Sequence, residues 1–406
     1  MKKLTKILVL CVLATFVAGS AMAVTLSDDN TGDYLIFPAY IADGPFETPI
    51  QVINTSDTHS VVAKVVFRGS AFSIELLDFF IYLSPNDVWT GKLVFQGGKT
   101  YVQSDDDSIA TGWNVDLEEP IWGDEQALNR ALVEKDCEYE QYGYIEVFEA
   151  WNGELPKDID NTVDKDEIYD AYDAASTAEI AQRDLINSLY GSFEINLPLQ
   201  GLSASENAVS FKDVFINNKL DFSETSLADA LATNADIEQL LNKVQAFMPY
   251  YQDPDEEGVT AHMFTFPTKR INPNSSCNAA TTTQGTGPFW MNNGLADQED
   301  PYCVEYGLTY YDLKENSPGK DQDLFSPVSE KQKSEFCDEL NINLSYDLDD
   351  EYEAGWVRYE FEGFATPYSE VCTMTGAPVI PLVMNFGPKG MSLYDAAYEF
   401  GTCLGD

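Results

Sequence analysis

Residues 34–95 read YLIFPAYIADGPFETPIQVINTSDTHSVVAKVVFRGSAFSIELLDFFIYLSPNDVWTGKLVF. In the middle of this stretch, apolar residues occupy alternate positions: Val61, Ala63, Val65 and Phe67. Lys64 and Arg68 occupy even positions. Alternation of this kind is typical of a β-strand with one face in a core and the other in water. We therefore expect Lys64 and Arg68 to face the solvent.

The alternation changes phase a few residues later. Phe72, Ile74 and Leu76 fall on even positions, and the next apolar residues fall on odd ones: Leu77, Phe79, Ile81 and Leu83. Because a shift of one residue turns a strand over, the change predicts a bulge or bend between Leu76 and Leu77. A strand could cross there from one sheet to another.

Turn sequences separate the strands of this stretch. An Asn-Thr-Ser-Asp run at 54–57, a Ser-Pro-Asn-Asp run at 84–87 and the Gly97-Gly98 pair each follow an apolar segment. Such residues favour tight turns and hairpins. Short strands with turns about every ten residues predict a mainly β chain with inserted helices, built as immunoglobulin-like antiparallel β-sandwiches.

The chain begins with the pattern of a secretory signal peptide. Lys2, Lys3 and Lys6 precede an apolar core at 7–18, and Ala21-Met22-Ala23 provides small residues for cleavage. We therefore exclude 1–23 from the fold and expect a secreted protein of the periplasm, the outer surface or the extracellular space. The apolar run is too short for a retained transmembrane anchor.

The composition is strongly acidic. Without the three signal lysines, 20 basic residues face 68 acidic ones, a net charge of −48. This charge repels nucleic acid, which we do not expect as a partner, and it attracts cations. A hydrophobic content of 44% is enough for a real core, so the chain is not a disordered acidic tail.

We expect two regions after the signal peptide: a β-sandwich at 24–222, with a helical insertion at about 120–190, and a second β-rich region with long loops at 223–406. Apolar residues at helical spacing predict helices at 164–190 and at about 226–248. Strands are expected in the second region at 262–267, 306–313, 340–346, 356–361 and 378–386.

Six cysteines follow the signal peptide, and an even number in an exported chain predicts disulfides. They are Cys137, Cys277, Cys303, Cys337, Cys372 and Cys403. Six cysteines allow fifteen pairings. We favour Cys277 with Cys303, because they bracket a polar loop that is otherwise costly to order.

Three short motifs resemble a group of uncharacterised exported bacterial proteins of β-sandwich type. They are the turn Asn54-Thr55-Ser56, the segment Thr265-Phe266-Pro267-Thr268-Lys269 and the strand Gly376-Ala377-Pro378-Val379. The resemblance implies secretion and a sandwich fold. It implies no activity and no catalytic residue.

Catalytic motifs are scarce. The two histidines, His59 and His262, have no Gly-x-Ser-x-Gly elbow to serve, and no phosphate-binding glycine loop is present. Six tryptophans could stack on sugars, although aromatic residues more often pack in cores. They are Trp89, Trp113, Trp122, Trp151, Trp290 and Trp356.

Calcium is the cofactor that the sequence allows, because calcium binds several carboxylate oxygens at once. The densest acidic run supplies Asp158, Asp160, Asp164 and Asp166 as candidate ligands. The run is not an EF-hand, and we favour the interpretation of a solvated acidic loop over that of a calcium site.

These patterns lead to two hypotheses about function. The first is an exported, non-enzymatic structural or binding protein of the cell surface or extracellular space, whose partners are cell-surface components or further copies of itself. The second is a secreted carbohydrate-binding or carbohydrate-cleaving protein that uses exposed aromatic side chains and paired carboxylates.

Overall fold

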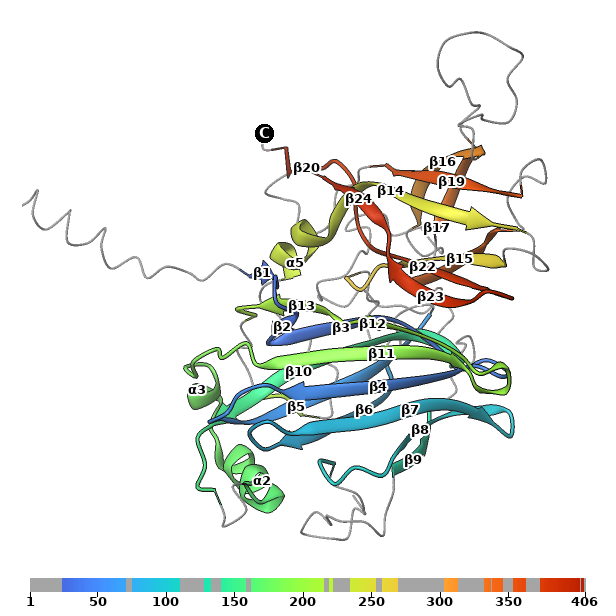
Figure 1. Cartoon of the computed structure of the whole chain (residues 1–406). Coiled ribbons are helices and arrows are strands. Elements are labelled where there is room, and N and C mark those ends of the chain that lie inside the picture. The colour runs from blue at the N-terminus through green and yellow to red at the C-terminus, as the bar shows by residue number, and fades with distance from the viewer. Residues whose placement is uncertain are drawn as a thin grey trace, which may run out of the picture.

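The computed structural model consists of antiparallel β-sheets with a few short helices (Figure 1). It describes residues 24–70, 75–109, 128–132, 140–157, 162–214, 219–221, 234–252, 258–268, 303–312, 332–336, 338–345, 353–362, 373–401 and 403–404. Every strand pairing among these residues is antiparallel, which confirms the predicted mainly β, sandwich-like class.

The N-terminal strands form two sheets. The first has the order β1-β13-β3-β10-β5-β6, and the second has the order β12-β11-β4-β7-β8-β9, with β2 paired to β11. The first sheet comprises β1 (Thr25–Leu26), β3 (Tyr34–Ile41), β5 (Ser60–Gly69), β6 (Glu75–Leu83), β10 (Tyr142–Gly153) and β13 (Val209–Lys212). The second comprises β2 (Thr31–Gly32), β4 (Glu47–Asn54), β7 (Val88–Gln96), β8 (Lys99–Ser104), β9 (Leu128–Ala131), β11 (Leu189–Leu197) and β12 (Leu202–Asn207).

The C-terminal strands form a second pair of sheets and a short ribbon. One sheet has the order β17-β16-β19-β14-β21, with β24 also paired to β14, and the other has the order β18-β15-β22-β23. The first contains β14 (Asn242–Tyr251), β16 (Val304–Asp312), β17 (Gln332–Phe336), β19 (Ala354–Phe361), β21 (Ala377–Pro378) and β24 (Ala397–Phe400). The second contains β15 (Val259–Thr265), β18 (Leu340–Leu344), β22 (Ile380–Gly387) and β23 (Gly390–Asp395), and the ribbon pairs β20 (Thr373–Met374) with β25 (Cys403–Leu404). These strands confirm the five predicted in this region.

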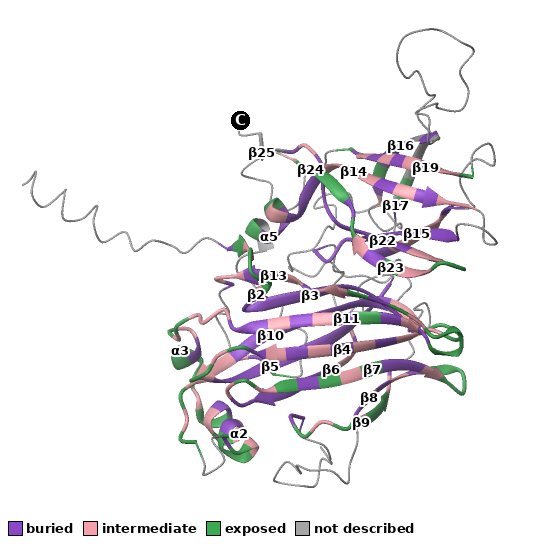
Figure 2. Cartoon of the chain, in the orientation of Figure 1, coloured by how far each residue is buried: buried purple, intermediate pink, exposed green. Residues whose placement is uncertain are grey.

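The expectation that one face of β5 lies in water is wrong. All ten residues of β5 are buried, because one face of its sheet packs on the neighbouring sheet and helices cover the other (Figure 2). Lys64 is 0% exposed and forms an ion pair with Asp78 on β6, with 2.7 Å between Nζ and Oδ2. Arg68 pairs with Glu146 on β10 at 2.6 Å. The basic residues therefore face a second core, where carboxylates balance their charge.

The predicted irregularity at Leu76 is present. Opposite β5, Phe67 pairs with Leu77 and Arg68 pairs with Glu75, which leaves Leu76 as an extra residue on β6. This bulge explains the change of phase in the sequence. The strand does not cross between sheets, because β6 stays beside β5 from Glu75 to Leu83.

The predicted turns also form. Gly97 and Gly98 join β7 to β8 with φ of 61° and 86°, and positive φ at both central residues is the signature of a type I′ hairpin. In the 54–57 turn, the Asn54 side chain accepts a hydrogen bond from the Ser56 backbone N–H at 3.1 Å. This is the local bond for which asparagine is favoured in turns.

The first predicted helix is shorter than expected. The structure has α2 (Lys165–Ala174) and α3 (Thr177–Ile180), and Leu189 already belongs to β11. Ile168 and Tyr172 of α2 are buried against the sheet that contains β5 and β6, as the helical spacing predicts. A short 3-10 helix, η1 (Pro198–Gln200), connects β11 to β12.

The second predicted helix is wrong from Asn242 onward. Of the predicted range, 226–233 lies outside the described residues, α5 (Asn234–Leu241) is helical, and the rest belongs to β14, which follows α5 directly. Ala246, Met248 and Tyr250 are buried on one face of that strand. Pro249 is tolerated because β24 pairs with β14 only as far as Phe247, so Pro249 lies on an open edge.

The two sandwiches are joined by a shared core and by hydrogen bonds. Met263 of β15 and Leu382 of β22 belong to the same buried cluster as Phe37 of β3. The backbone N–H of Leu340 donates to the carbonyl of Ser70 at 3.0 Å. The boundary predicted near residue 222 lies outside the described residues.

Candidate functional site

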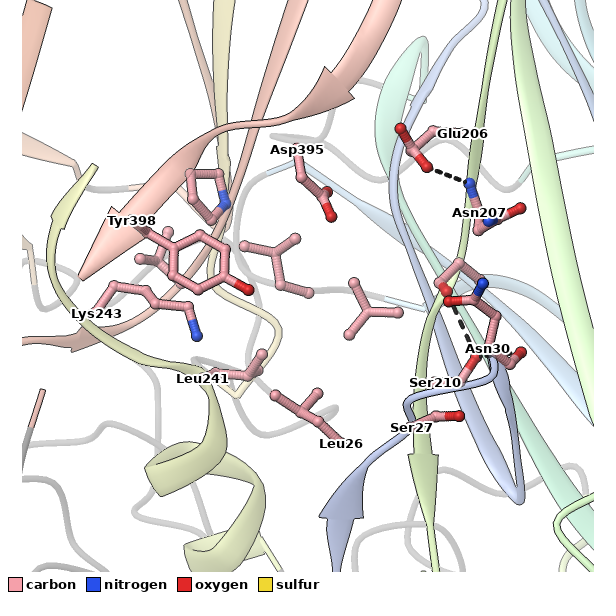
Figure 3. A pocket seen from close by; sticks show the side chains of 15 residues that line it. Leu26, Ser27, Asn30, Glu206, Asn207, Ser210, Leu241, Lys243, Asp395 and Tyr398 are labelled. Atoms are coloured by element: carbon pink, nitrogen blue, oxygen red, sulfur yellow. Dashed lines mark hydrogen bonds between the residues drawn. The ribbon is translucent and has the colours of Figure 1, made fainter. Parts of the chain in front are cut away.

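A pocket of about 180 Å³ lies where the two sandwiches meet, and we call it the seam pocket. Its first wall comes from the N-terminal sandwich and consists of Leu26, Ser27, Asn30, Glu206, Asn207, Ala208, Val209 and Ser210. Its second wall comes from the C-terminal sandwich and consists of Leu241, Lys243, Val379, Ile380, Pro381, Asp395 and Tyr398. Figure 3 shows the two sets of side chains facing each other across the gap.

Lys243 is the most unusual residue of the pocket. It follows α5 as the second residue of β14 and is 3% exposed. Its Nζ donates to the carbonyl of Leu240 at 3.2 Å and lies 4.4 and 3.9 Å from the ring centroids of Tyr398 and Phe400. Burial lowers the pKa of this amine to about 7, against an opposing effect of the Asp395 charge.

The aromatic contacts of Lys243 come from an exposed edge strand. Tyr398 and Phe400 lie two residues apart on β24, so their side chains share one face of that strand. They are 40% and 53% exposed, and their rings meet edge to face at 5.1 Å. The pairing of Lys243 with Phe400 across the two strands brings the amine to these rings.

Two carboxylates line the pocket, one on each wall. Asp395 ends β23, and Glu206 lies near the end of β12 on the other sandwich. Asp395 is exposed at the rim of the pocket and Glu206 is half-buried. Partial desolvation, with the negative charge of Glu206, raises the pKa of the Asp395 carboxyl to about 6, although Lys243 opposes the rise. One oxygen of Glu206 accepts the Asn207 backbone N–H at 2.9 Å.

Hydrogen bonds fix the polar groups of the first wall. The Ser210 hydroxyl donates to the carbonyl of Asn30 at 2.9 Å, and the Tyr190 hydroxyl donates to the side-chain oxygen of Asn207 at 2.6 Å. Asn30 itself has a φ of 62°. Asparagine is one of the few residues that adopt this left-handed conformation readily, and here it directs the chain from β1 to β2 along the pocket.

A second group of ionisable side chains lies deep in the N-terminal sandwich. Asp33 is 1% exposed and accepts backbone N–H bonds from Asn187 at 2.8 Å and from Asp213 at 3.1 Å. It lies beside the fully buried Glu149 of β10, with which it shares a hydrogen bond. The Arg183 Nε is 3.6 Å from a Glu149 oxygen.

This buried pair holds a proton. Burial, together with the charge of the adjacent Glu149, raises the pKa of Asp33 to about 8, and burial also raises the pKa of Glu149 itself. Neither carboxyl reaches the solvent, so a polysaccharide has no access to them. Through its hydrogen bonds, the pair connects β10 and the start of β3 to the segments around Asn187 and Asp213.

The predicted calcium ligands are only partly described. Asp158 and Asp160 lie outside the described residues. Asp164 is the N-cap of α2, where its carboxylate accepts the Asp166 backbone N–H at 3.0 Å, and both residues are exposed. Among the described residues, no group of three or more histidine, cysteine or acidic side chains is arranged to hold a metal ion. The calcium site therefore stays a prediction.

Two of the six cysteines lie in the described residues: Cys303, next to β16, and Cys403 in β25. Cys303 is disulfide-bonded. The other four, Cys137, Cys277, Cys337 and Cys372, fall outside the described part. The Cys277–Cys303 pairing and a full set of disulfides remain predictions.

The described histidines and tryptophans lie in the core, at partly buried positions or in a turn. His262 is buried, with its ring nitrogens 3.0 Å from the Tyr359 hydroxyl and 2.8 Å from the Pro249 carbonyl, and burial lowers its pKa to about 4. His59 lies in the turn before β5. Trp89 is fully buried, and Trp151 and Trp356 are partly buried. The remaining tryptophans are outside the described residues.

Sequence reasoning missed the seam pocket. The helical spacing predicts a helix at Lys243, and the residues that meet it in the structure come from three other parts of the chain. The one available signal was a single lysine within the apolar run LLNKVQAFM at 240–248, where a charge needs a partner.

Comparison with known proteins gives no relative. No protein-family model matches the sequence, and no curated protein or solved structure matches it. Within the described residues, the helices are too short or too polar to cross a bilayer. The function has to be inferred from the seam pocket itself.

Proposed function

We propose that the protein is an exported, non-enzymatic binding protein of the cell surface or extracellular space, and that it holds a small ligand in the seam pocket. The signal-peptide pattern at 1–23 supports export. Walls contributed by both sandwiches support a binding site, because concave sites between domains are the usual places for small ligands.

One observation carries the proposal. The Lys243 ammonium has three donors, and the described residues supply one acceptor, the carbonyl of Leu240. A buried charge with unfilled hydrogen-bonding capacity is costly unless another group completes it. A ligand in the seam pocket would supply the missing acceptors.

The test is a ligand screen by thermal melting with purified mature protein. The panel contains amino acids, amines, organic acids, monosaccharides and oligosaccharides, and each hit is repeated on Lys243→Met. The proposal expects at least one compound that raises the melting temperature of the wild type and not of the variant. If no compound does so, the seam pocket is not a binding site.

The carbohydrate hypothesis is the second candidate, and the exposed Tyr398 and Phe400 favour it. Exposed rings on an edge strand can stack on a sugar, and the same panel tests this. A glycan that binds the wild type and loses binding in Tyr398→Ala with Phe400→Ala, while Lys243→Met retains it, would favour this candidate.

A further inference from the structure

We infer that the seam pocket binds a small zwitterion, an aliphatic amino acid or a compound with the same pair of charged groups. This inference rests on the proposed function and names the chemical class of its ligand. It follows from three features of the walls: a cation, a pair of carboxylates and an apolar surface beside them.

The cation fits the carboxylate of such a ligand. Lys243 Nζ lies on the second wall with two donors that no described residue fills. The hydroxyl of Tyr398 belongs to the same wall, and the ring holds the amine in place. A carboxylate at this point would complete the hydrogen bonding of the ammonium with short, charge-assisted bonds.

The carboxylates fit the ammonium of the ligand. Asp395 and Glu206 come from different sandwiches and lie close enough for the charge of Glu206 to act on Asp395. Two like charges that meet across an interface are unfavourable unless a cation lies between them. An ammonium there would have three donors for the two carboxylates.

The apolar surface fits a hydrocarbon side chain. Leu26 and Leu241 lie together at the end of the pocket away from Asp395 (Figure 3). Val379, Ile380 and Pro381 continue the apolar lining. A cavity of about 180 Å³ is small for a ligand site, which suits an amino acid rather than a peptide.

Ligands with a single charge fit less well. A simple amine would satisfy Asp395 and Glu206 but would bring a second cation near Lys243. A simple carboxylate would satisfy Lys243, yet it would meet both pocket carboxylates and the strongly negative field of the whole chain. Only a ligand with both groups places an opposite charge at both ends of the pocket.

The experiment compares three compounds with one hydrocarbon skeleton by isothermal titration calorimetry. Leucine carries both charges, 3-methylbutylamine carries the ammonium alone, and 4-methylpentanoate carries the carboxylate alone. We expect leucine to bind at least about tenfold more tightly than either analogue, since each lost charged hydrogen bond costs at least this factor. The proteins are the wild type, Lys243→Met, Lys243→Arg, Asp395→Asn and the exposed control Lys92→Met.

The variants test the binding of the ligand's carboxylate and of its ammonium separately. Lys243→Met should abolish the preference for leucine over the amine, and Asp395→Asn, which leaves Glu206 in place, should reduce its preference over the carboxylate. At pH 8 the wild type should take up a proton when it binds leucine, because pairing recharges Lys243, and Lys243→Arg should bind leucine without this uptake. Heats measured in two buffers of different ionisation enthalpy give the proton count. Lys92→Met should match the wild type.

The outcomes separate this inference from the proposed function. If the amine or the carboxylate alone binds as tightly as leucine, with the same dependence on Lys243, the pocket is a binding site but its ligand is not a zwitterion. If leucine fails while another compound of the melting screen binds through Lys243, the inference is wrong and the proposed function stands. If nothing binds through Lys243, both fall.

Discussion

The buried Asp33–Glu149 pair predicts an unusual dependence of stability on pH. Asp33 has an ordinary pKa of 3.8, and the folded protein raises it to about 8. Between these two values the folded state holds a proton that the unfolded state releases. The contribution of Asp33 to stability is therefore full below about pH 4 and is lost as the pH rises through about 8.

The size of this effect follows from the shift. With one pKa unit equal to about 1.4 kcal/mol, the free energy of unfolding should lose about 3 to 4 kcal/mol between pH 5 and pH 8 through this group. The two carboxyls share the proton, so the loss belongs to the pair and not to one residue. Other carboxylates add their own pH dependence, and only a difference between variants isolates the pair.

The perturbation is Asp33→Asn, which leaves an uncharged side chain beside Glu149. The amide can donate to Glu149 and accept from Asn187, although it has one acceptor fewer for the Asp213 N–H. We expect Asp33→Asn to be less stable than the wild type at pH 5 and to lose less stability by pH 8. The two curves should converge or cross as the pH rises.

The assay is urea unfolding followed by tryptophan fluorescence at half-unit steps from pH 5 to 8.5. The control is Asp57→Asn, an exposed residue in the turn before β5, which should run parallel to the wild type. Parallel curves for the wild type and Asp33→Asn would refute the shared proton, because the pH dependence of the difference would then be zero.

Three further predictions concern stability. Lys64→Met should destabilise the fold by about 3 to 5 kcal/mol in urea unfolding, because Asp78 is left as an uncompensated buried charge. The double variant Lys64→Met with Asp78→Leu should recover part of this loss, and a Lys64→Met protein as stable as the wild type would contradict the buried pair. Gly143→Ala should prevent folding or lower the melting temperature sharply, since its Cβ would lie 1.9 Å from the Arg68 carbonyl oxygen, and a normal circular dichroism melt would disprove that contact. Asp164→Ala should lower the free energy of unfolding by about 1 kcal/mol because it removes the N-cap of α2, whereas Asp164→Asn, which keeps a capping oxygen, should lower it little. The melting temperature in calcium should exceed that in chelator, at matched ionic strength, only if the acidic run at 158–166 binds the ion.

The strands of this fold could be predicted where the sequence alternates. The phase change at Leu76 predicts the bulge, and the Gly97-Gly98 pair predicts the hairpin, because both effects depend only on neighbouring residues. The burial of Lys64 was not predictable from its own strand. It depends on Asp78, which lies on the same face of the adjacent strand, and on helices encoded about 100 residues later.

The segment 240–248 shows why the candidate site was missed. Leu240, Leu241, Val244 and Met248 suit a helical stripe, while Ala246, Met248 and Tyr250 suit a strand, so periodicity alone does not choose. The choice is made by β19 and β24, whose residues lie about 100 and 150 positions further along the chain. Lys243 becomes a pocket residue only after those strands pair.

The burial of basic residues makes the surface of the protein more acidic than its composition alone indicates. Lys64, Arg68, Arg183 and Lys243 are buried, and three of them pair with carboxylates in the interior. The chain has few basic residues, and burying some of them leaves an outer surface dominated by acidic groups. The electric field of this surface repels a free anion and attracts a cation before either reaches the pocket.

Added salt weakens this field, with a screening length of about 10 Å at 0.1 M and about 3 Å at 1 M. The binding of 4-methylpentanoate should therefore strengthen with salt, that of 3-methylbutylamine should weaken, and that of leucine should change least. A leucine affinity that followed the salt dependence of either analogue would mean that only one of its charges is bound in the pocket.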